Sequence, residues 1–136
     1  MTIDIQHLKQ WEGKTESCDD LISPNPIAAL AATLGNEARM QAPAGELPPL
    51  WHWLYCLPLA PRQQLDSDGH PVRGGFLPPV PLPRRMWAGG RLTFLRPLRV
   101  GEAIERTSRV VNVTAKEGPS RSLVFLLVRH ELGNSE

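Results

Sequence analysis

Arginine, glycine and tryptophan are concentrated in one short stretch of the second half of the chain. The residues of these three types in the stretch are Arg84, Arg85, Trp87, Gly89, Gly90 and Arg91. A planar guanidinium can form two parallel hydrogen bonds with a phosphate group, and glycine lets a ligand approach the backbone closely. The stretch therefore predicts a site for a phosphate-bearing ligand. A solvated strand face that pairs with the acidic first half of the chain would explain the same charges.

A second group of residues has the types that contact a substrate. Trp51 and His52 stand in the apolar run 50–57, and Gly74 and Gly75 come shortly before a pair of prolines. Paired glycines followed by paired prolines give a loop that is locally permissive and then locally rigid. We expect these four residues to contact substrate. The alternatives are a core histidine with a satisfied hydrogen bond and tryptophans that only fill the core.

Composition and charge exclude several functional classes. The 136 residues are 41% hydrophobic and 21% charged, and no apolar run is long enough to cross a bilayer. The first ten residues lack the apolar core of a signal peptide, so we expect a cytoplasmic protein without membrane contact. The net charge of +1 and a pI that is only mildly basic argue against nucleic acid as a partner.

The cysteines predict neither a disulfide framework nor a metal site. Cys18 and Cys56 are far apart in the sequence and belong to no pattern with metal-ligand spacing. We expect two free thiols and no bound metal.

The elements that must position these residues follow from local patterns. Residues 4–11 predict a short helix capped by Asp4, and 15–22 an extended connector. Ser23 and Pro24 predict the start of a second helix, whose many alanines suggest packing against a flat surface. The run 50–57 predicts a helix enclosed by a sheet. Ten of the fourteen prolines lie between residues 43 and 83, which argues against long regular elements there.

Alternation and apolar runs predict three strands in the last third of the chain. They are expected at residues 86–96, 103–115 and 122–132, and the polar turn 116–120 joins the last two. Three residues of the middle strand are predicted to be core, namely Ile104, Val111 and Val113. The last strand is nearly continuously apolar, which predicts a central position with both faces covered.

Three segments carry a resemblance to a known family. They read PPLWHWLYCLPLAP, then GHPVRGGFLPPVPLPRRMWAGGRLTFLRPLRVGE, then VTAKEGPSRSLVFLLVRHEL. Together they resemble the N-terminal half of the MaoC-like hydratases, in the branch of the itaconyl-CoA and mesaconyl-CoA hydratases and the HTD2-like hydroxyacyl dehydratases. The resemblance implies an α+β hot-dog fold, in which an antiparallel sheet wraps around a central helix. It also implies work on acyl-CoA or acyl carrier protein thioesters, with CoA as part of the substrate and no separate cofactor.

The chain departs from that family at the catalytic motif. Members usually continue into a second hot-dog repeat with a D-x-N-P-L-H type motif, which carries the catalytic Asp and His. The similar stretch here has Ser23 in place of the Asp and Ala28 in place of the His. Hydration of an enoyl thioester needs a base, an acid and donors to the developing oxyanion. We therefore expect no catalytic residue in this chain.

The sequence thus predicts the non-catalytic, CoA-binding half of an enoyl-CoA hydratase, completed by a second hot-dog domain. That domain would be a catalytic partner chain or a homodimer mate. Two alternatives stay open, a thioester-binding or assembly module without chemistry and a hot-dog thioesterase that uses Asp66, Asp68 or Glu102. We expect one domain over residues 1–136, with helices in 1–40, a Pro/Gly-rich cover with a short helix in 41–85, and antiparallel strands in 86–132.

Overall fold

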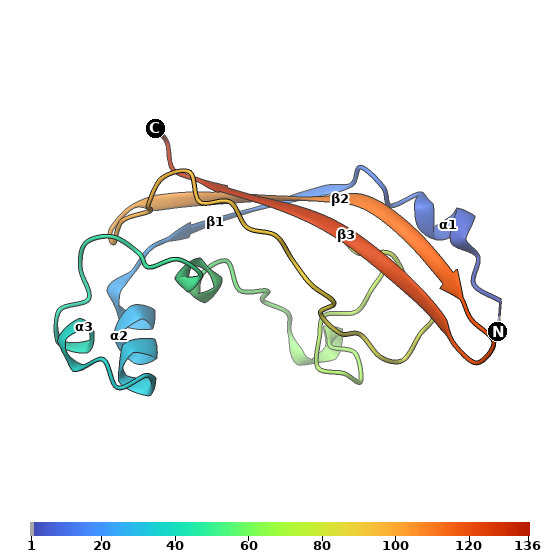
Figure 1. Cartoon of the computed structure of the whole chain (residues 1–136), viewed down its shortest axis with the longest axis horizontal. Coiled ribbons are helices and arrows are strands. Elements are labelled where there is room, and N and C mark those ends of the chain that lie inside the picture. The colour runs from blue at the N-terminus through green and yellow to red at the C-terminus, as the bar shows by residue number, and fades with distance from the viewer. Residues whose placement is uncertain (1) are drawn as a thin grey trace. The chain divides into compact units, whose positions relative to one another are not determined.

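An antiparallel sheet organises the chain, whose computed structural model describes residues 2–136 (Figure 1). Within these residues the sheet has three strands in the order β1 (Thr15–Leu21), β2 (Ala103–Glu117) and β3 (Ser122–Gly133). Backbone hydrogen bonds join Lys14 to Val110 and Ile22 to Glu102, so β1 runs antiparallel to β2. A short turn then reverses the chain between β2 and β3. The α+β class predicted from the sequence is confirmed.

The helices are short, and their caps explain where two of them begin. Asp4 accepts a hydrogen bond from the His7 amide at 3.0 Å, and Asn36 accepts one from the Arg39 amide at 3.1 Å. The segments in order are α1 (Ile5–Lys9), α2 (Pro24–Thr33), α3 (Glu37–Gln41), and two 3₁₀ turns, η1 (Trp51–Leu54) and η2 (Arg62–Gln64). The expected helices at 4–11 and after Ser23 are thus present. The sequence analysis did not predict α3.

The chain forms two compact units, each assembled from separate stretches of sequence. Unit 1 contains the N-terminal stretch up to Ser17, Pro58–Ala88 and Thr107–Glu131. Unit 2 contains Cys18–Leu57, Gly89–Arg106 and Leu132–Glu136.

The core of unit 2 joins helix α2 to the sheet. Ile27 of α2 and Ile104 of β2 belong to one buried cluster, which also contains Ile22, Leu47 and Tyr55. The buried Tyr55 hydroxyl donates a hydrogen bond to the Ser23 carbonyl at 2.6 Å, at the start of α2. Ile27 thus shares a buried cluster with Ile104 of β2, whereas the elements that lie beside α2 are α3 and η1.

The core of unit 1 joins helix α1 to the other part of β2. Leu8 of α1 is buried against Val110 and Val113, which are both fully buried. Buried positions in β2 change from even to odd numbers between these two valines, as an extra residue in the strand would produce. The shift buries Val113, whereas Val111 has the exposed parity of the preceding part of β2 and is 43% exposed, so its predicted place in the core was wrong. The predictions for Ile104 and Val113 are confirmed.

Four further sequence predictions are corrected by tertiary structure. Residues 15–22 contain strand β1 rather than a connector, because β2 offers this stretch a partner edge. The apolar run 50–57 forms only the 3₁₀ turn η1, bounded by positive φ angles at Leu50 and Cys56. Residues 86–96 form no strand, because their backbone pairs with none of the three strands of the sheet. Strand β3 lies at a sheet edge and alternates in burial, so it is not central.

Among the described residues, no helix has the length and apolar character needed to cross a membrane.

Two leucines of unit 1 provide a matched test of this core. Leu8 is 2% exposed, whereas Leu127 on β3 is 59% exposed. Leu8→Ala should lower the free energy of unfolding by about 2 to 5 kcal/mol, because it leaves a cavity against the valines. Leu127→Ala should change it by about 0.5 kcal/mol or less. Urea unfolding of both variants measures the difference, and equal losses would contradict the assignment of the core.

Candidate functional site

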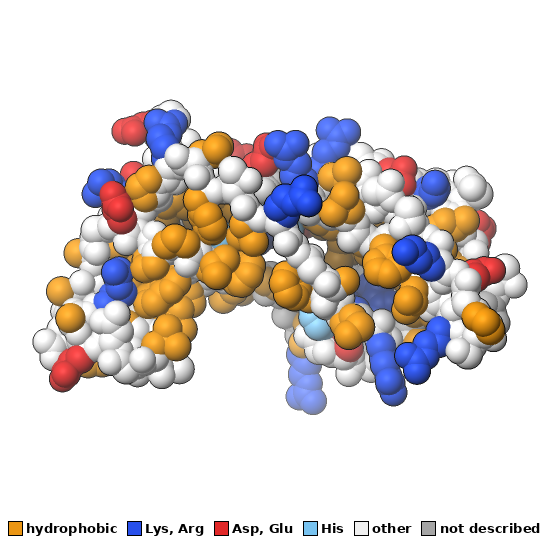
Figure 2. All heavy atoms as spheres, in the orientation of Figure 1, with side chains coloured by type: hydrophobic (Ala, Val, Ile, Leu, Met, Phe, Trp, Pro, Cys, Tyr) orange, Lys and Arg blue, Asp and Glu red, His pale blue; other side chains and the backbone are white. Residues whose placement is uncertain are grey.

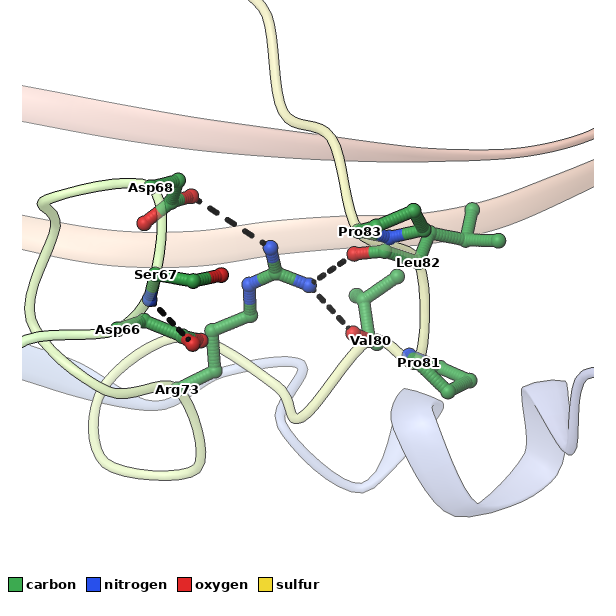
Figure 3. Close-up of a pocket in the computed structure, with 8 residues that line it drawn as sticks. All are labelled: Asp66, Ser67, Asp68, Arg73, Val80, Pro81, Leu82 and Pro83. Atoms are coloured by element: carbon green, nitrogen blue, oxygen red, sulfur yellow. Dashed lines mark hydrogen bonds and ion pairs between the residues drawn. The ribbon is translucent and has the colours of Figure 1, made fainter.

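A pocket of about 400 Å³ lies in unit 1, within the proline-rich part of the chain (Figure 3). One wall carries polar side chains and the other consists mainly of apolar residues and prolines. The lining residues are Asp66, Ser67, Asp68, Arg73, Val80, Pro81, Leu82 and Pro83. Proline has no amide donor, so this segment cannot complete a regular hydrogen-bonded ladder.

Arg73 ties the two walls of the pocket together. Its side chain extends between them in Figure 3, and one terminal nitrogen donates hydrogen bonds to the carbonyls of Val80 and Leu82. The other terminal nitrogen lies 3.7 Å from a carboxylate oxygen of Asp68. The Arg73 side chain is 14% exposed, so its charge is well shielded from water. These contacts order a loop that has little secondary structure of its own.

Asp68 is the acidic centre of this arrangement. Its carboxylate accepts a hydrogen bond from the His70 amide at 3.0 Å and one from Arg85 Nε at 2.8 Å. The His70 ring nitrogen Nδ1 lies 3.4 Å from the same carboxylate. The His70 amide, followed by Arg85, lowers the pKa of Asp68, although partial burial opposes this shift. The group therefore remains a carboxylate at neutral pH and is a weak base.

Five predicted site residues fall in unit 1: Gly74, Gly75, Arg84, Arg85 and Trp87. Gly74 has φ 103°, a conformation that favours glycine, and the Trp11 indole donates a hydrogen bond to the Gly75 carbonyl at 3.0 Å. Arg84 and Trp87 are exposed, with Trp87 at 76%. Arg85 is the one of the five that the structure brings to Asp68. One of its terminal nitrogens is buried without a partner among the described residues.

The other five predicted residues fall in unit 2: Trp51, His52, Gly89, Gly90 and Arg91. The His52 ring packs edge-on against Phe94, with 6.2 Å between the ring centroids. Arg39 of α3 lies 5.6 Å from the centre of the Trp51 ring, within reach of a cation–π contact. Gly89, Gly90 and Arg91 are exposed. The predicted ligand stretch 84–91 therefore divides between the units after Ala88.

Arg73 was not among the residues predicted for the site, and Asp68 was named only as a candidate carboxylate of the hot-dog thioesterase. Their pairing joins side chains five positions apart through a turn closed by Gly69, which has φ 80°. The alternation of Asp68 and His70 ahead of an arginine was the available signal. No local pattern indicated that Arg73 would hold carbonyls on the far side of the loop.

Two contacts involve histidine and a residue that often assists it in catalysis. One is Asp68 with His70, and the other is the Ser108 hydroxyl, 2.7 Å from His130 Nδ1. Ser108 is fully buried, so its oxygen has no access to a substrate in this structure. Asp68 is neutralised by Arg73 and Arg85. The histidines are the exposed members of these pairs, with the His70 side chain 55% exposed, whereas the carboxylate and the hydroxyl beside them are shielded.

The pKa of Asp68 predicts how the stability of this loop depends on pH. A carboxyl group whose pKa is lowered by folding stabilises the protein above its unfolded pKa, about 3.9, and this contribution is lost as the pH falls through the folded value. Asp68→Asn should therefore destabilise the protein at pH 5 to 7, and the difference from the natural chain should shrink below about pH 4. Urea unfolding across this range measures the effect. Asp66→Asn is the matched control, and a difference for Asp68→Asn that persists at low pH would contradict the role of its charge.

Comparison with known proteins identifies the family. The model of the family hydroxyacyl-thioester dehydratase type 2 matches residues 50–135. The mesaconyl-C(4)-CoA hydratase of Chloroflexus aurantiacus is 47% identical over 126 residues, which cover 93% of this chain and 45% of that protein. The mitochondrial hydroxyacyl-thioester dehydratase type 2 of Schizosaccharomyces pombe is 33% identical over 63% of this chain and 31% of its own length. The chain thus spans less than half of these curated relatives. It belongs to the hydroxyacyl-thioester dehydratase type 2 family of hot-dog hydratases.

Proposed function

We propose that this chain is the non-catalytic, CoA-binding hot-dog half of an enoyl-CoA hydratase, which adds water reversibly to an unsaturated acyl thioester such as mesaconyl-CoA. The observation that carries the proposal is the uneven overlap with the Chloroflexus aurantiacus hydratase. The match covers 93% of this chain but only 45% of that protein. A second, catalytic hot-dog domain supplies the rest of the site.

The arrangement of polar groups supports a separation of roles, with CoA binding in this chain and acid-base catalysis in the other hot-dog half. Hydration of an enoyl thioester needs a base that activates water, an acid that protonates the α-carbon and donors to the enolate-like oxygen. Asp68 is held by two arginines, and Ser108 is buried. In the proposed arrangement the base and the acid come from the catalytic half, while the exposed arginines of this chain contribute to binding the CoA phosphates.

The edge strand β3 offers a surface for this partner. Leu123, Phe125 and Leu127 alternate along the strand, so they share one face, and they are 49%, 39% and 59% exposed. Hydrophobic side chains also emerge between Lys and Arg side chains on the face drawn in Figure 2. An exposed apolar row on an edge strand is suited to pairing with another sheet.

A homodimer mate is the second candidate partner, because the same row on β3 is suited to a second copy of the chain. In that case the chain is a thioester-binding or assembly module without chemistry. The hot-dog thioesterase is less well supported. Asp66 accepts a hydrogen bond from the Ser67 amide at 2.8 Å and Glu102 accepts one from the Arg99 amide at 2.9 Å, as turn residues do.

The composition of the native assembly tests the proposal directly. Light scattering and intact mass spectrometry of the protein purified from its own cells should reveal a second polypeptide with a D-x-N-P-x-H motif. That assembly should hydrate mesaconyl-C(4)-CoA, whereas the isolated chain should give no turnover above the uncatalysed rate. Hydration by the isolated chain at the rate of the assembly would contradict the non-catalytic role. A pure homo-oligomer without activity would favour the binding module.

Arginine variants test the CoA site on the isolated chain. Arg84→Ala and Arg91→Ala should each weaken CoA binding by about 1 to 3 kcal/mol, because a charge-assisted hydrogen bond to phosphate is lost. Arg85→Ala should weaken it as well. Arg121→Ala, in the exposed turn before β3, is the control with a matched charge change and should bind normally. Isothermal titration with free CoA measures the affinities, and unchanged affinity would remove the residue concerned from the site.

A further inference from the structure

Two cysteines that are far apart in the sequence meet in unit 2. Cys18 lies on β1 and is half-buried, whereas Cys56 follows the turn η1 and is 3% exposed. The Cys56 sulfur lies 3.5 Å from the carbonyl oxygen of Cys18. Both residues are free thiols. Their spacing in the sequence gave no sign of this contact.

The backbone at Cys56 is fixed by neighbours on both β1 and β2. The Cys56 amide donates a hydrogen bond to Asp20 Oδ2 at 2.7 Å, and Arg106 donates one to the Cys56 carbonyl at 3.1 Å. Cys56 has φ 53°, in the left-handed region that residues other than glycine rarely adopt. Such a conformation persists only where the surroundings impose it. The structure thus holds the sulfur of Cys56 against Cys18 at a cost in backbone strain.

The two thiols have different surroundings. Burial, followed by a hydrogen bond with the Cys18 side chain, raises the pKa of Cys56 to about 12, although the charge of Arg106 opposes this shift. Cys56 is therefore a protonated thiol at neutral pH and reacts slowly with external oxidants. Cys18 is the more exposed of the two and is the first point of attack.

We propose that Cys18 and Cys56 form a reversible intramolecular disulfide when the protein is exposed to a peroxide. The thiolate of Cys18 attacks hydrogen peroxide, the O–O bond breaks, and hydroxide leaves, so that Cys18 becomes a sulfenic acid. The sulfur of Cys56 then attacks the Cys18 sulfur. The S–O bond breaks as the S–S bond forms, and the departing oxygen takes up the Cys56 proton to give water. A small-molecule thiol reverses the reaction by thiol–disulfide exchange.

This disulfide would reduce the conformational freedom of the turn η1 in unit 2. It joins β1 to the residue two positions after η1, and η1 contains Trp51 and His52. A cross-link limits the separations that the chain between its ends can reach. Oxidation therefore restricts opening of the turn that carries the two predicted substrate contacts. The inference concerns the chain itself and does not depend on the proposed hydratase partner.

Mass spectrometry of the whole chain tests the bond. Purified protein is treated with hydrogen peroxide, unfolded, and alkylated with N-ethylmaleimide. The natural chain should take up no alkylating agent and yield a cross-linked peptide pair containing Cys18 and Cys56, two hydrogen masses lighter than the sum of the two reduced peptides. Treatment with dithiothreitol should restore two reactive thiols. Oxygen added at Cys18 or Cys56 in the peptide spectra, or a covalent dimer, would overturn the proposal, whereas oxygen added at the exposed Met86 would not.

Cys18→Ser provides the matched control for the mechanism. This variant should keep one alkylatable thiol after peroxide treatment and show no loss of hydrogen mass. Hydrogen exchange of the folded protein tests the consequence, and amides in residues 50–57 should exchange more slowly after oxidation of the natural chain. Residues 73–83 of unit 1 serve as the internal reference. Equal exchange in the oxidised and reduced forms would exclude the restriction of η1.

Discussion

The pairing of β2 on both of its edges is the constraint on which the rest of the structure depends. Strand β2 hydrogen bonds to β1 on one side and to β3 on the other. Its buried residues belong to two different cores, with Ile104 in the core of unit 2 and Val110 and Val113 in that of unit 1. Both helices that cover these cores, α1 and α2, directly flank β1 in the sequence. The register of a single strand thus decides which side chains each core receives.

Local chemistry explains which parts of this fold could be predicted from the sequence. Asp4 and the Ser23-Pro24 pair are local signals that mark the start of a helix. The turn at residues 116–120 specifies the β2–β3 hairpin through its own residues and those next to it in the sequence. The strand predicted at residues 86–96 failed because strand formation depends on a partner edge, which local alternation cannot reveal. The apolar run of β3 was misjudged for a related reason. A sequence does not show whether an apolar face is covered by its own chain or left open.

The candidate site shows the same limit at the level of single side chains. The arginine-rich stretch was visible in the sequence, but its partners were not, since Asp68 reaches Arg85 across seventeen residues. The contact between Cys18 and Cys56 spans thirty-eight residues and depends on the unusual backbone at Cys56. In both cases the residue types were ordinary and the chemistry came from the tertiary arrangement. Resemblance to the hydratases indicated the class of ligand, whereas the environment of each group came from the structure.

The contacts of the Arg73 guanidinium determine which substitutions the proline-rich loop that lines the pocket can accept during evolution. The carbonyls that it binds belong to Val80 and Leu82, each followed by a proline that provides no amide donor. Because Arg73 recognises main-chain oxygens, the side chains at positions 80 and 82 are free to vary in shape without loss of these hydrogen bonds. Lysine at position 73 would bring a compact ammonium in place of the planar fork that spans both oxygens and Asp68. Position 73 should therefore be restricted among relatives by these hydrogen bonds, and positions 80 and 82 only by their packing against the core of unit 1.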